Sequence, residues 1–228
     1  MQVRIGLLNK KPALTADEFR MHWRDIHGAI AARLPRLKSY EQNHVLPVEQ
    51  RGSGFKSGAE RIDGFSELSF GNDADMRAAM ATDVGKSLIA NESRFLERVR
   101  VVTVDRIEVV PPPKEGTYIK RISLLRRRPE LSPEEFTKEW LGVHASLIKA
   151  IPGVIGYRQN LVTGRQVPKG TEVDYDGLPI DGIVELWFPS LGALTTAFAS
   201  AEGKETVTHS GKFLDEITTF PVEPIFIV

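Results

Sequence analysis

The sequence predicts an α+β protein built from two similar halves, because one series of residues occurs twice in the 228-residue chain. Residues of the first copy recur 117 positions later, as for Pro12 and Pro129, and from residue 63 onward the offset is 118. Both copies read as strand, helix, strand, strand, helix, strand. A period this long indicates duplication of a domain, since solenoid repeats are roughly 20 to 50 residues long. The matched pairs include Trp23 and Trp140, His27 and His144, Tyr40 and Tyr157, Gln42 and Gln159, and Glu67 and Glu185.

The composition is that of a globular protein and excludes several kinds of partner. Thirty basic and thirty acidic residues cancel, so no overall field gathers nucleic acid or an anionic membrane, and neither is expected as a partner. With no cysteine, the chain has no disulfide framework, no thiolate zinc site and no cysteine nucleophile. No stretch approaches the ~18 apolar residues of a membrane span, so we expect a cytoplasmic protein.

Each half begins with a strand followed by a capped helix. Residues 2–9 and 118–125 carry apolar side chains at alternate positions, which is typical of a strand. Thr15 with Glu18 and Ser132 with Glu135 have the spacing of a capping box, which starts a helix. Apolar residues then follow at helical spacing, so one stripe of each helix is expected to be buried. The predicted stripes are Phe19, Trp23, Ile26, Ile30 and Leu34, and Phe136, Trp140, Val143, Leu147 and Ile151.

The remaining elements are predicted in the same order in both halves. Pro35 and Pro152 end the first helices, and polar, glycine-containing segments indicate a long loop in each half, which is often functional. Second strands are predicted at 37–46 and 154–162, long loops at 48–61 and 163–178, and third strands at 64–70 and 183–188. A helical region follows at 73–99, broken near 83–85, and its counterpart at 190–217 is broken near 203. Closing strands are predicted at 101–109 and 218–227.

This order of elements is the ferredoxin-like arrangement, with helices on one face of an antiparallel sheet. The proline-rich segment 111–116 is the natural linker, so we expect one domain at 1–110 and a second at 117–228. The open face of each sheet needs a cover, and the other half of the chain can provide it. A monomer is therefore plausible, while further dimerisation stays open.

A longer run of residues supports a family resemblance. The segment 9–45 contains Lys-Pro, then Glu-Phe-x-x-x-Trp-x-x-x-His, then Leu-Pro and Tyr-Glu-Gln-Asn-His-Val, and it resembles the EthD family of the dimeric α+β barrel superfamily. The second copy keeps most of this pattern but has Leu161 where the first has His44. The resemblance covers nearly the whole chain and implies two ferredoxin-like repeats that form an intrachain pseudo-two-fold α+β barrel. It leaves the reaction open, since the superfamily contains cofactor-free monooxygenases, isomerases, decarboxylases and haem enzymes.

His27 is the first candidate catalytic residue. It follows Trp23 by four positions and so shares the buried face of the helix, and His144 repeats this placement. An imidazole in an apolar cleft can transfer a proton near neutral pH. A core histidine that is hydrogen-bonded to the protein explains the same pattern equally well. Because the first half has three histidines against two, it is the better candidate if only one site works.

The second strand adds polar candidates to the site. Tyr40, Gln42 and His44 alternate and so share one face, while Asn43 lies on the other. Tyr40 and His44 join His27 and His144 as candidate catalytic residues, and the alternative is that the polar tips of this strand are satisfied locally. A carboxylate at Glu67 or Glu185 either holds a histidine in one tautomer or lies at the rim of the barrel. The candidate substrate-binding residues are Trp23, Gln42, Asn43, Glu67, Trp140, Tyr157, Gln159 and Glu185.

No metal or cofactor site is predicted. His22 precedes His27 by five residues, which lacks the i, i+4 relation of helical zinc sites and places His22 off the buried stripe, in solvent. The chain has no dinucleotide or phosphate-binding loop and no Gly-x-Ser-x-Gly elbow, and Gly52-Ser53-Gly54 is interpreted as a flexible loop. The sequence leaves haem open but offers no signature for it.

These residues favour proton-transfer chemistry on a small, apolar or cyclic molecule held between helix and sheet. Isomerisation, decarboxylation and cofactor-independent oxygenation, of the catabolic kind that the family resemblance implies, all fit. The alternative is a non-catalytic protein that binds a small molecule and whose histidines are structural.

Overall fold

The computed structural model describes residues 2–47, 55–58 and 61–228 of the chain. The first half consists of β1 (Gln2–Lys10), α1 (Ala16–Met21), η1 (His22–His27), α2 (Gly28–Ala31), β2 (Leu37–Val45), β3 (Gly64–Phe70), α3 (Asp73–Ala81), α4 (Asp83–Phe95) and β4 (Leu96–Val110). The second consists of β5 (Ile119–Arg127), α5 (Pro133–Lys138), η2 (Glu139–Val143), α6 (His144–Ala150), β6 (Gly156–Gln166), β7 (Gly182–Phe188), α7 (Leu191–Ala199), α8 (Ala201–Ser210) and β8 (Leu214–Phe226).

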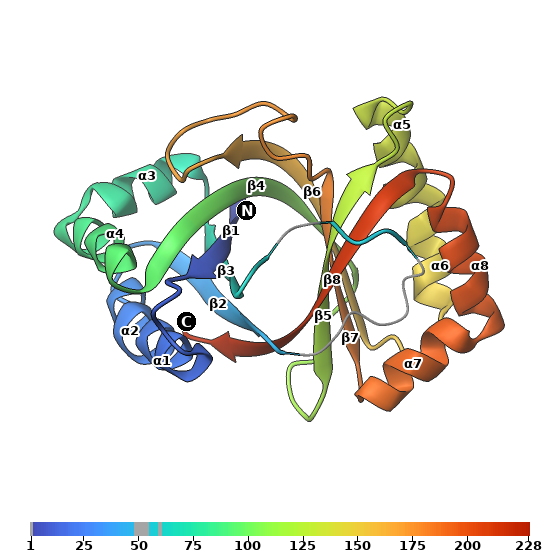
Figure 1. Ribbon diagram of the computed structural model, residues 1–228, viewed down its shortest axis with the longest axis horizontal. Helices are drawn as coiled ribbons and strands as arrows, with labels where there is room; N and C mark the ends of the chain where they lie inside the picture. Colours follow the sequence, from blue (N-terminus) through green and yellow to red (C-terminus); the bar gives the residue numbers. More distant parts are fainter. Residues whose placement is uncertain (1, 48–54, 59–60) are drawn as a thin grey trace.

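The strands close into one antiparallel barrel in the order β1-β3-β2-β8-β5-β7-β6-β4. Strand β8 of the second half pairs with β2 of the first, and β4 of the first pairs with β6 of the second. Figure 1 shows α1 to α4 on one side of the strands and α5 to α8 on the other. The prediction of two ferredoxin-like repeats that form a fused α+β barrel is therefore confirmed.

The helix starts follow from the capping boxes seen in the sequence. The hydroxyl of Thr15 accepts from the backbone N–H of Glu18, and the Glu18 carboxylate accepts in return from the Thr15 N–H. Ser132 and Glu135 make the same pair of bonds at the start of α5. Each box satisfies backbone donors that a helix otherwise leaves unpaired.

A π-helical turn in each half shifts the predicted buried stripe by one residue. The backbone N–H of Gly28 bonds to the carbonyl of Trp23, five residues back, so this turn contains an extra residue. Ile26 and Val143, which were expected in the stripes, are 47% and 55% exposed instead. After the extra residue the buried face of the first helix continues through His27, Ala31 and Leu34.

Several element boundaries differ from the predicted ones. The second helical regions break at Thr82 and Ser200, each of which ends one helix and caps the next. Helices α4 and α8 end earlier than predicted, at Phe95 and Ser210, because long closing strands begin soon after them. The predicted loop at 163–178 begins with four residues of β6. Most of the predicted loop at 48–61, including Gly52-Ser53-Gly54, lies outside the described residues.

The barrel interior has an apolar part and a charged part. The apolar cluster includes Val3, Ile5, Phe65, Val102, Ile122 and Phe220. In the charged part, Lys120 is fully buried, and its Nζ lies 2.6 Å from Glu41, 2.7 Å from Glu185 and 3.2 Å from Glu67. Arg106 lies 2.5 Å from Glu67 and 2.9 Å from Glu185. The carboxylates raise the pKa of Lys120 even though burial alone lowers it.

None of the helices in the described part of the chain has the length and apolarity that crossing a membrane requires.

Candidate functional site

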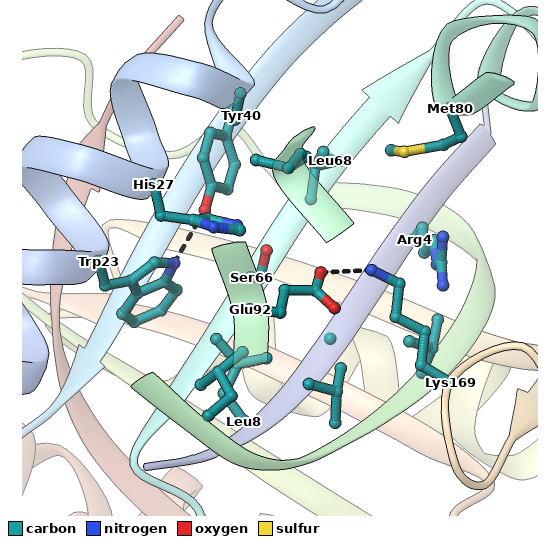
Figure 2. Close-up of a pocket in the computed structure, with 16 residues that line it drawn as sticks. Arg4, Leu8, Trp23, His27, Tyr40, Ser66, Leu68, Met80, Glu92 and Lys169 are labelled. Atoms are coloured by element: carbon teal, nitrogen blue, oxygen red, sulfur yellow. Dashed lines mark hydrogen bonds and ion pairs between the residues drawn. The ribbon is translucent and has the colours of Figure 1, made fainter. Parts of the chain in front are cut away.

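Each half contains a cleft between its helices and the outer face of its sheet. The first cleft has a cavity of about 40 Å³ that opens to solvent. Figure 2 shows Trp23, His27 and Tyr40 on one side of this cleft and Arg4, Glu92 and Lys169 on the other. We call it the His27 cleft.

His27 is held by a hydrogen bond from one side of its ring. Its Nδ1 lies 3.1 Å from Oδ1 of Asn91 on α4, and with that oxygen as acceptor Nδ1 carries the proton. Within the described residues Nε2 of His27 has no hydrogen-bond partner, so its lone pair is available. Burial, opposed by the bond to Asn91, lowers the pKa of His27 to about 4. The ring is therefore neutral at pH 7 and can accept a proton.

The π-helical turn also brings His22 to Asn91. Nε2 of His22 lies 3.2 Å from the same Asn91 oxygen, and its ring stacks on Phe95 at 4.7 Å. A turn with i to i+5 hydrogen bonds places residues five apart on one face. The expectation that His22 lies off the buried face, in solvent, is therefore wrong, since it is half-buried.

Tyr40 presents a phenol to the His27 cleft. Its oxygen accepts from Nε1 of Trp23 at 2.9 Å and from Nε2 of Gln42 at 3.1 Å. Burial raises the pKa of Tyr40 to about 12, so the phenol keeps its proton at neutral pH and can donate it in a hydrogen bond. Trp23 reaches this position because β3 has glycine beneath it, and a Cβ at Gly64 would lie 2.3 Å from the indole ring.

The mouth of the His27 cleft is completed by the second half of the chain. Lys169, in the loop between β6 and β7, donates its backbone N–H to the carbonyl of Val99 at 2.9 Å. Its Nζ forms an ion pair with Glu92, and Arg4 donates to Oε1 of Gln166 at 3.3 Å. This loop is the one that the sequence predicted as long.

The second half has a corresponding cleft, the His144 cleft, with a cavity of about 50 Å³. Nδ1 of His144 lies 3.4 Å from Nδ1 of His209, which occupies the position of Asn91 in the repeat, and Nε2 of His209 lies 3.3 Å from Glu139. If His209 donates to Glu139, its Nδ1 accepts from His144 and leaves Nε2 of His144 unprotonated. Burial lowers the pKa of His144 to about 3.

The first half in turn closes the His144 cleft. Phe55 lines this cleft, and the carbonyl of the next residue, Lys56, accepts from the backbone N–H of Ile217 at 3.1 Å. Each cleft is thus completed by a loop from the other half.

Some predicted site residues lie away from both clefts. Gln42 and Gln159 are fully buried and donate to the carbonyls of Trp23 and Trp140, at 2.8 and 2.7 Å, so they brace the π-helical turns. Nε2 of His44 lies 3.1 Å from Oε1 of Gln42, and its ring packs on Trp23 at 4.4 Å. Burial lowers the pKa of His44 to about 4. Tyr157 is buried among the apolar residues under the second helices.

Three further candidates face the barrel interior and not a cleft. Asn43 donates to Glu67 at 2.7 Å, and Asn160 donates to Glu185 at the same distance. Both carboxylates are neutralised by Lys120 and Arg106, so they do not hold a histidine, and they are buried inside the barrel, away from its rim. Their location does not support the predicted substrate-binding role of Asn43, Glu67 and Glu185.

Sequence reasoning missed the hydrogen-bond partners of the two cleft histidines and one arginine in each cleft. Asn91 and His209 occupy equivalent positions at the offset of 118, next to the repeated Phe-Leu pair, and this was the available signal for them. Arg4 and Arg121 are likewise equivalent, at the offset of 117. Within residues 2–47, 55–58 and 61–228, no three histidine, aspartate or glutamate side chains gather in a way that suits a metal ion.

Comparisons with solved structures reproduce this fold. The chain resembles a protein named "putative monooxygenase" from Fusobacterium nucleatum, with a TM-score of 0.64 and 7% identity over 99% of this chain and 93% of that one. An anthrone oxidase-like protein gives a TM-score of 0.64 and 10% identity over 99% of this chain and 92% of that one. A protein from Lactobacillus acidophilus, also named "putative monooxygenase", gives a TM-score of 0.59 and 9% identity over 100% of this chain and 94% of that one. At these identities the likeness shows the fold alone.

Sequence comparisons identify the family. A search of curated proteins finds no match. The model of the EthD domain matches the chain twice, over residues 11–98 and 128–217, which together make up more than half of the chain. Each match includes one of the two cleft histidines, His27 or His144. The chain therefore belongs to the EthD family and carries two EthD domains in tandem.

Proposed function

We propose that the helix-sheet clefts bind a small apolar or cyclic molecule, and that His27 and His144 transfer a proton to or from it without a cofactor. The observation that carries this proposal is the state of the two imidazoles. Each is buried and neutral, each is oriented through Nδ1 by a polar partner, and each lines a cavity. A neutral, oriented imidazole is the form that accepts a proton, and a pKa of about 4 for His27 or about 3 for His144 makes it a weaker base than one that titrates near pH 7.

The residues around His27 suggest how the step proceeds. Nε2 removes a proton from a carbon next to a carbonyl group, and the phenol of Tyr40 donates a hydrogen bond to the oxygen on which negative charge develops. Return of the proton to another carbon gives an isomerase, and reaction of the carbanion with dioxygen gives an oxygenase. The names of structures with the same fold include monooxygenase and oxidase, which agrees with the second outcome. Decarboxylation, in which carbon dioxide leaves and the carbanion takes a proton from water, is the third.

A second candidate function is non-catalytic binding of a small molecule. The observation that favours it is that each histidine is bonded to a protein partner through Nδ1 and has a pKa of about 4 or 3, so that it is a weak base at neutral pH. In this function the histidines serve to hold the first helix against α4 or α8.

The test compares histidine variants after a ligand has been found in a thermal-shift screen of small aromatic and lactone compounds. We expect His27→Ala to abolish turnover or ligand binding with little change in thermal stability, and His144→Ala to have a milder effect. His44→Ala is the matched control, because His44 is buried nearby but does not line a cleft. Equally large losses of stability in the His27 and His144 variants, with no effect on the ligand, would make both residues structural.

A further inference from the structure

Arg121 on β5 is a buried cation in the wall of the His144 cleft. The residue is only 8% exposed, and its guanidinium lies over the ring of Phe198, 4.4 Å from the centroid. Burial lowers the pKa of Arg121 to about 10, which leaves the side chain protonated at neutral pH. The cleft therefore contains a full positive charge in surroundings that are largely apolar.

This charge has no counterion in the described part of the protein. Nε and Nη1 of Arg121 are buried without a hydrogen-bond partner there. The described residues that line the His144 cleft include no aspartate or glutamate. An unpaired buried charge is costly, and buried cations in proteins are normally matched by an anion.

The equivalent arginine of the first half shows what is missing. Arg4 lines the His27 cleft together with Glu92, which raises its pKa against the effect of burial, and it also donates to Gln166 at 3.3 Å. The repeat offset of 118 places Ser210 at the position of Glu92, and the Ser210 hydroxyl donates to the carbonyl of Thr206 at 3.0 Å. The His144 cleft has thus kept the arginine but has no carboxylate to match it.

We propose that the His144 cleft binds a small organic monocarboxylate, with the carboxylate on Arg121 and the apolar body of the molecule against β7 and α6. One arginine matches one negative charge, and a guanidinium binds a carboxylate through two parallel hydrogen bonds. The hydroxyl of Ser123, which is buried and has no partner among the described residues, lines the same wall and can donate a further bond.

The walls of the cleft indicate why the anion is organic. Ile148, Val184 and Leu186 line it, and they suit a hydrocarbon group. Inorganic phosphate carries more charge than a single arginine matches. The cavity of about 50 Å³ opens to solvent, so the body of the acid can extend from Arg121 toward the mouth of the cleft. This inference deepens the proposed function by naming a substrate class, and it rests on that function only in taking the cleft as a binding site.

The test measures binding of acetate, butyrate and benzoate by isothermal titration calorimetry, each beside its neutral amide. We expect the acids to bind and the amides to bind far more weakly. Arg121→Met should weaken benzoate binding by about 10- to 150-fold, the range for loss of hydrogen bonds to a charged group. Without ligand, Arg121→Met should melt at the same or a higher temperature than the wild type, because it removes an unpaired buried charge.

A second variant keeps the test decisive if Arg121→Met fails to fold. Ser210→Glu places a carboxylate where the first half has Glu92, and it should abolish benzoate binding while Arg121 remains. Arg4→Met is the matched control in the other cleft, and it should leave the benzoate affinity unchanged.

Three results would overturn the inference: equal affinity for benzoate and benzamide, tighter binding of inorganic phosphate than of benzoate, or a benzoate affinity within twofold of the wild type in Arg121→Met. Failure of the proposed function looks different. In that case the acids bind through Arg121, but His144→Ala changes neither their affinity nor any reaction. If instead only neutral molecules bind and His144 matters, the carboxylate assignment fails and the proposed function stands.

Discussion

Replacement of Lys120 by methionine should destabilise the whole barrel. The Nζ atom lies within 3.2 Å of three carboxylates, those of Glu41, Glu67 and Glu185, and Lys120 is fully buried. Its loss leaves Glu41 without an ion-pair partner among the described residues, whereas Glu67 and Glu185 keep Arg106, and Arg158 lies 3.8 Å from Glu185. Breaking a buried ion pair by removing one partner costs about 3 to 5 kcal/mol.

A loss of this size is large against the total stability of a typical domain, which is roughly 5 to 15 kcal/mol. For a chain of this length it corresponds to a fall in melting temperature of about 6 to 20 °C. Urea unfolding followed by circular dichroism at pH 8 measures the change in the free energy of unfolding. The control is Lys38→Met, since Lys38 lies exposed on β2 and should change stability by less than about 0.5 kcal/mol.

The pH dependence gives an independent check of the same argument. The pKa of Lys120 is raised, so its contribution is fully present below the unfolded pKa of about 10.5 and is lost only as the pH rises through the higher folded value. In the variant, burial and repulsion from the neighbouring carboxylates raise the pKa of Glu41, which has lost its ion-pair partner. The deficit relative to wild type therefore shrinks as the pH falls from 8 to 5, because the contribution of the buried histidines is the same in both proteins and cancels in the difference. A free energy of unfolding within 0.5 kcal/mol of wild type at pH 8, or a deficit that does not change with pH, would refute the reasoning.

Two further predictions follow from the clefts. Burial lowers the pKa values of His27 and His44 to about 4 and that of His144 to about 3, whereas the unfolded values are near 6.5. As the pH falls, the unfolded chain therefore binds protons before the folded one does. The free energy of unfolding should decrease as the pH drops from 6.5 toward 4. Imidazole resonances of these three residues that titrate near pH 6.5 in NMR spectra would contradict this. Gly64→Ala should lower the free energy of unfolding in urea by about 1 to 3 kcal/mol, because its Cβ would lie 2.3 Å from the Trp23 ring. The control is Gly142→Ala, which should be neutral or stabilising because its Cβ would have no neighbour within 4 Å. Equal effects of the two alanines would count against the close approach of indole and strand.

The fold was predictable because independent local signals agreed. The repeat, the two capping boxes and the alternation of the strands all indicated the same order of elements, and the structure has that order. The side-chain spacing of the first helix, by contrast, predicted a buried Ile26 and an exposed His22, whereas Ile26 is exposed and His22 is half-buried. Spacing assumes a regular α-helix, and a π-helical turn is a change of backbone hydrogen bonding that leaves no pattern in the side chains.

The site was only partly predictable. Trp23, His27, Tyr40, Trp140 and His144 line the clefts, whereas Gln42, Asn43 and His44 of β2 and the two glutamates do not. Glu67 forms its ion pair with Lys120 at a separation of 53 residues, across the two halves. Such a pair depends on how the barrel closes, and neither half of the sequence contains this information alone.

Because the two halves are encoded separately within one gene, the residues of one cleft can change without the same change in the other. In a symmetric homodimer, any codon change is expressed in both sites at once, so both must tolerate it. In this chain, Glu92 and Ser210 occupy equivalent positions and yet differ, as do Asn91 and His209. The two clefts of one polypeptide are therefore chemically distinct, and a substitution in one need not alter the other.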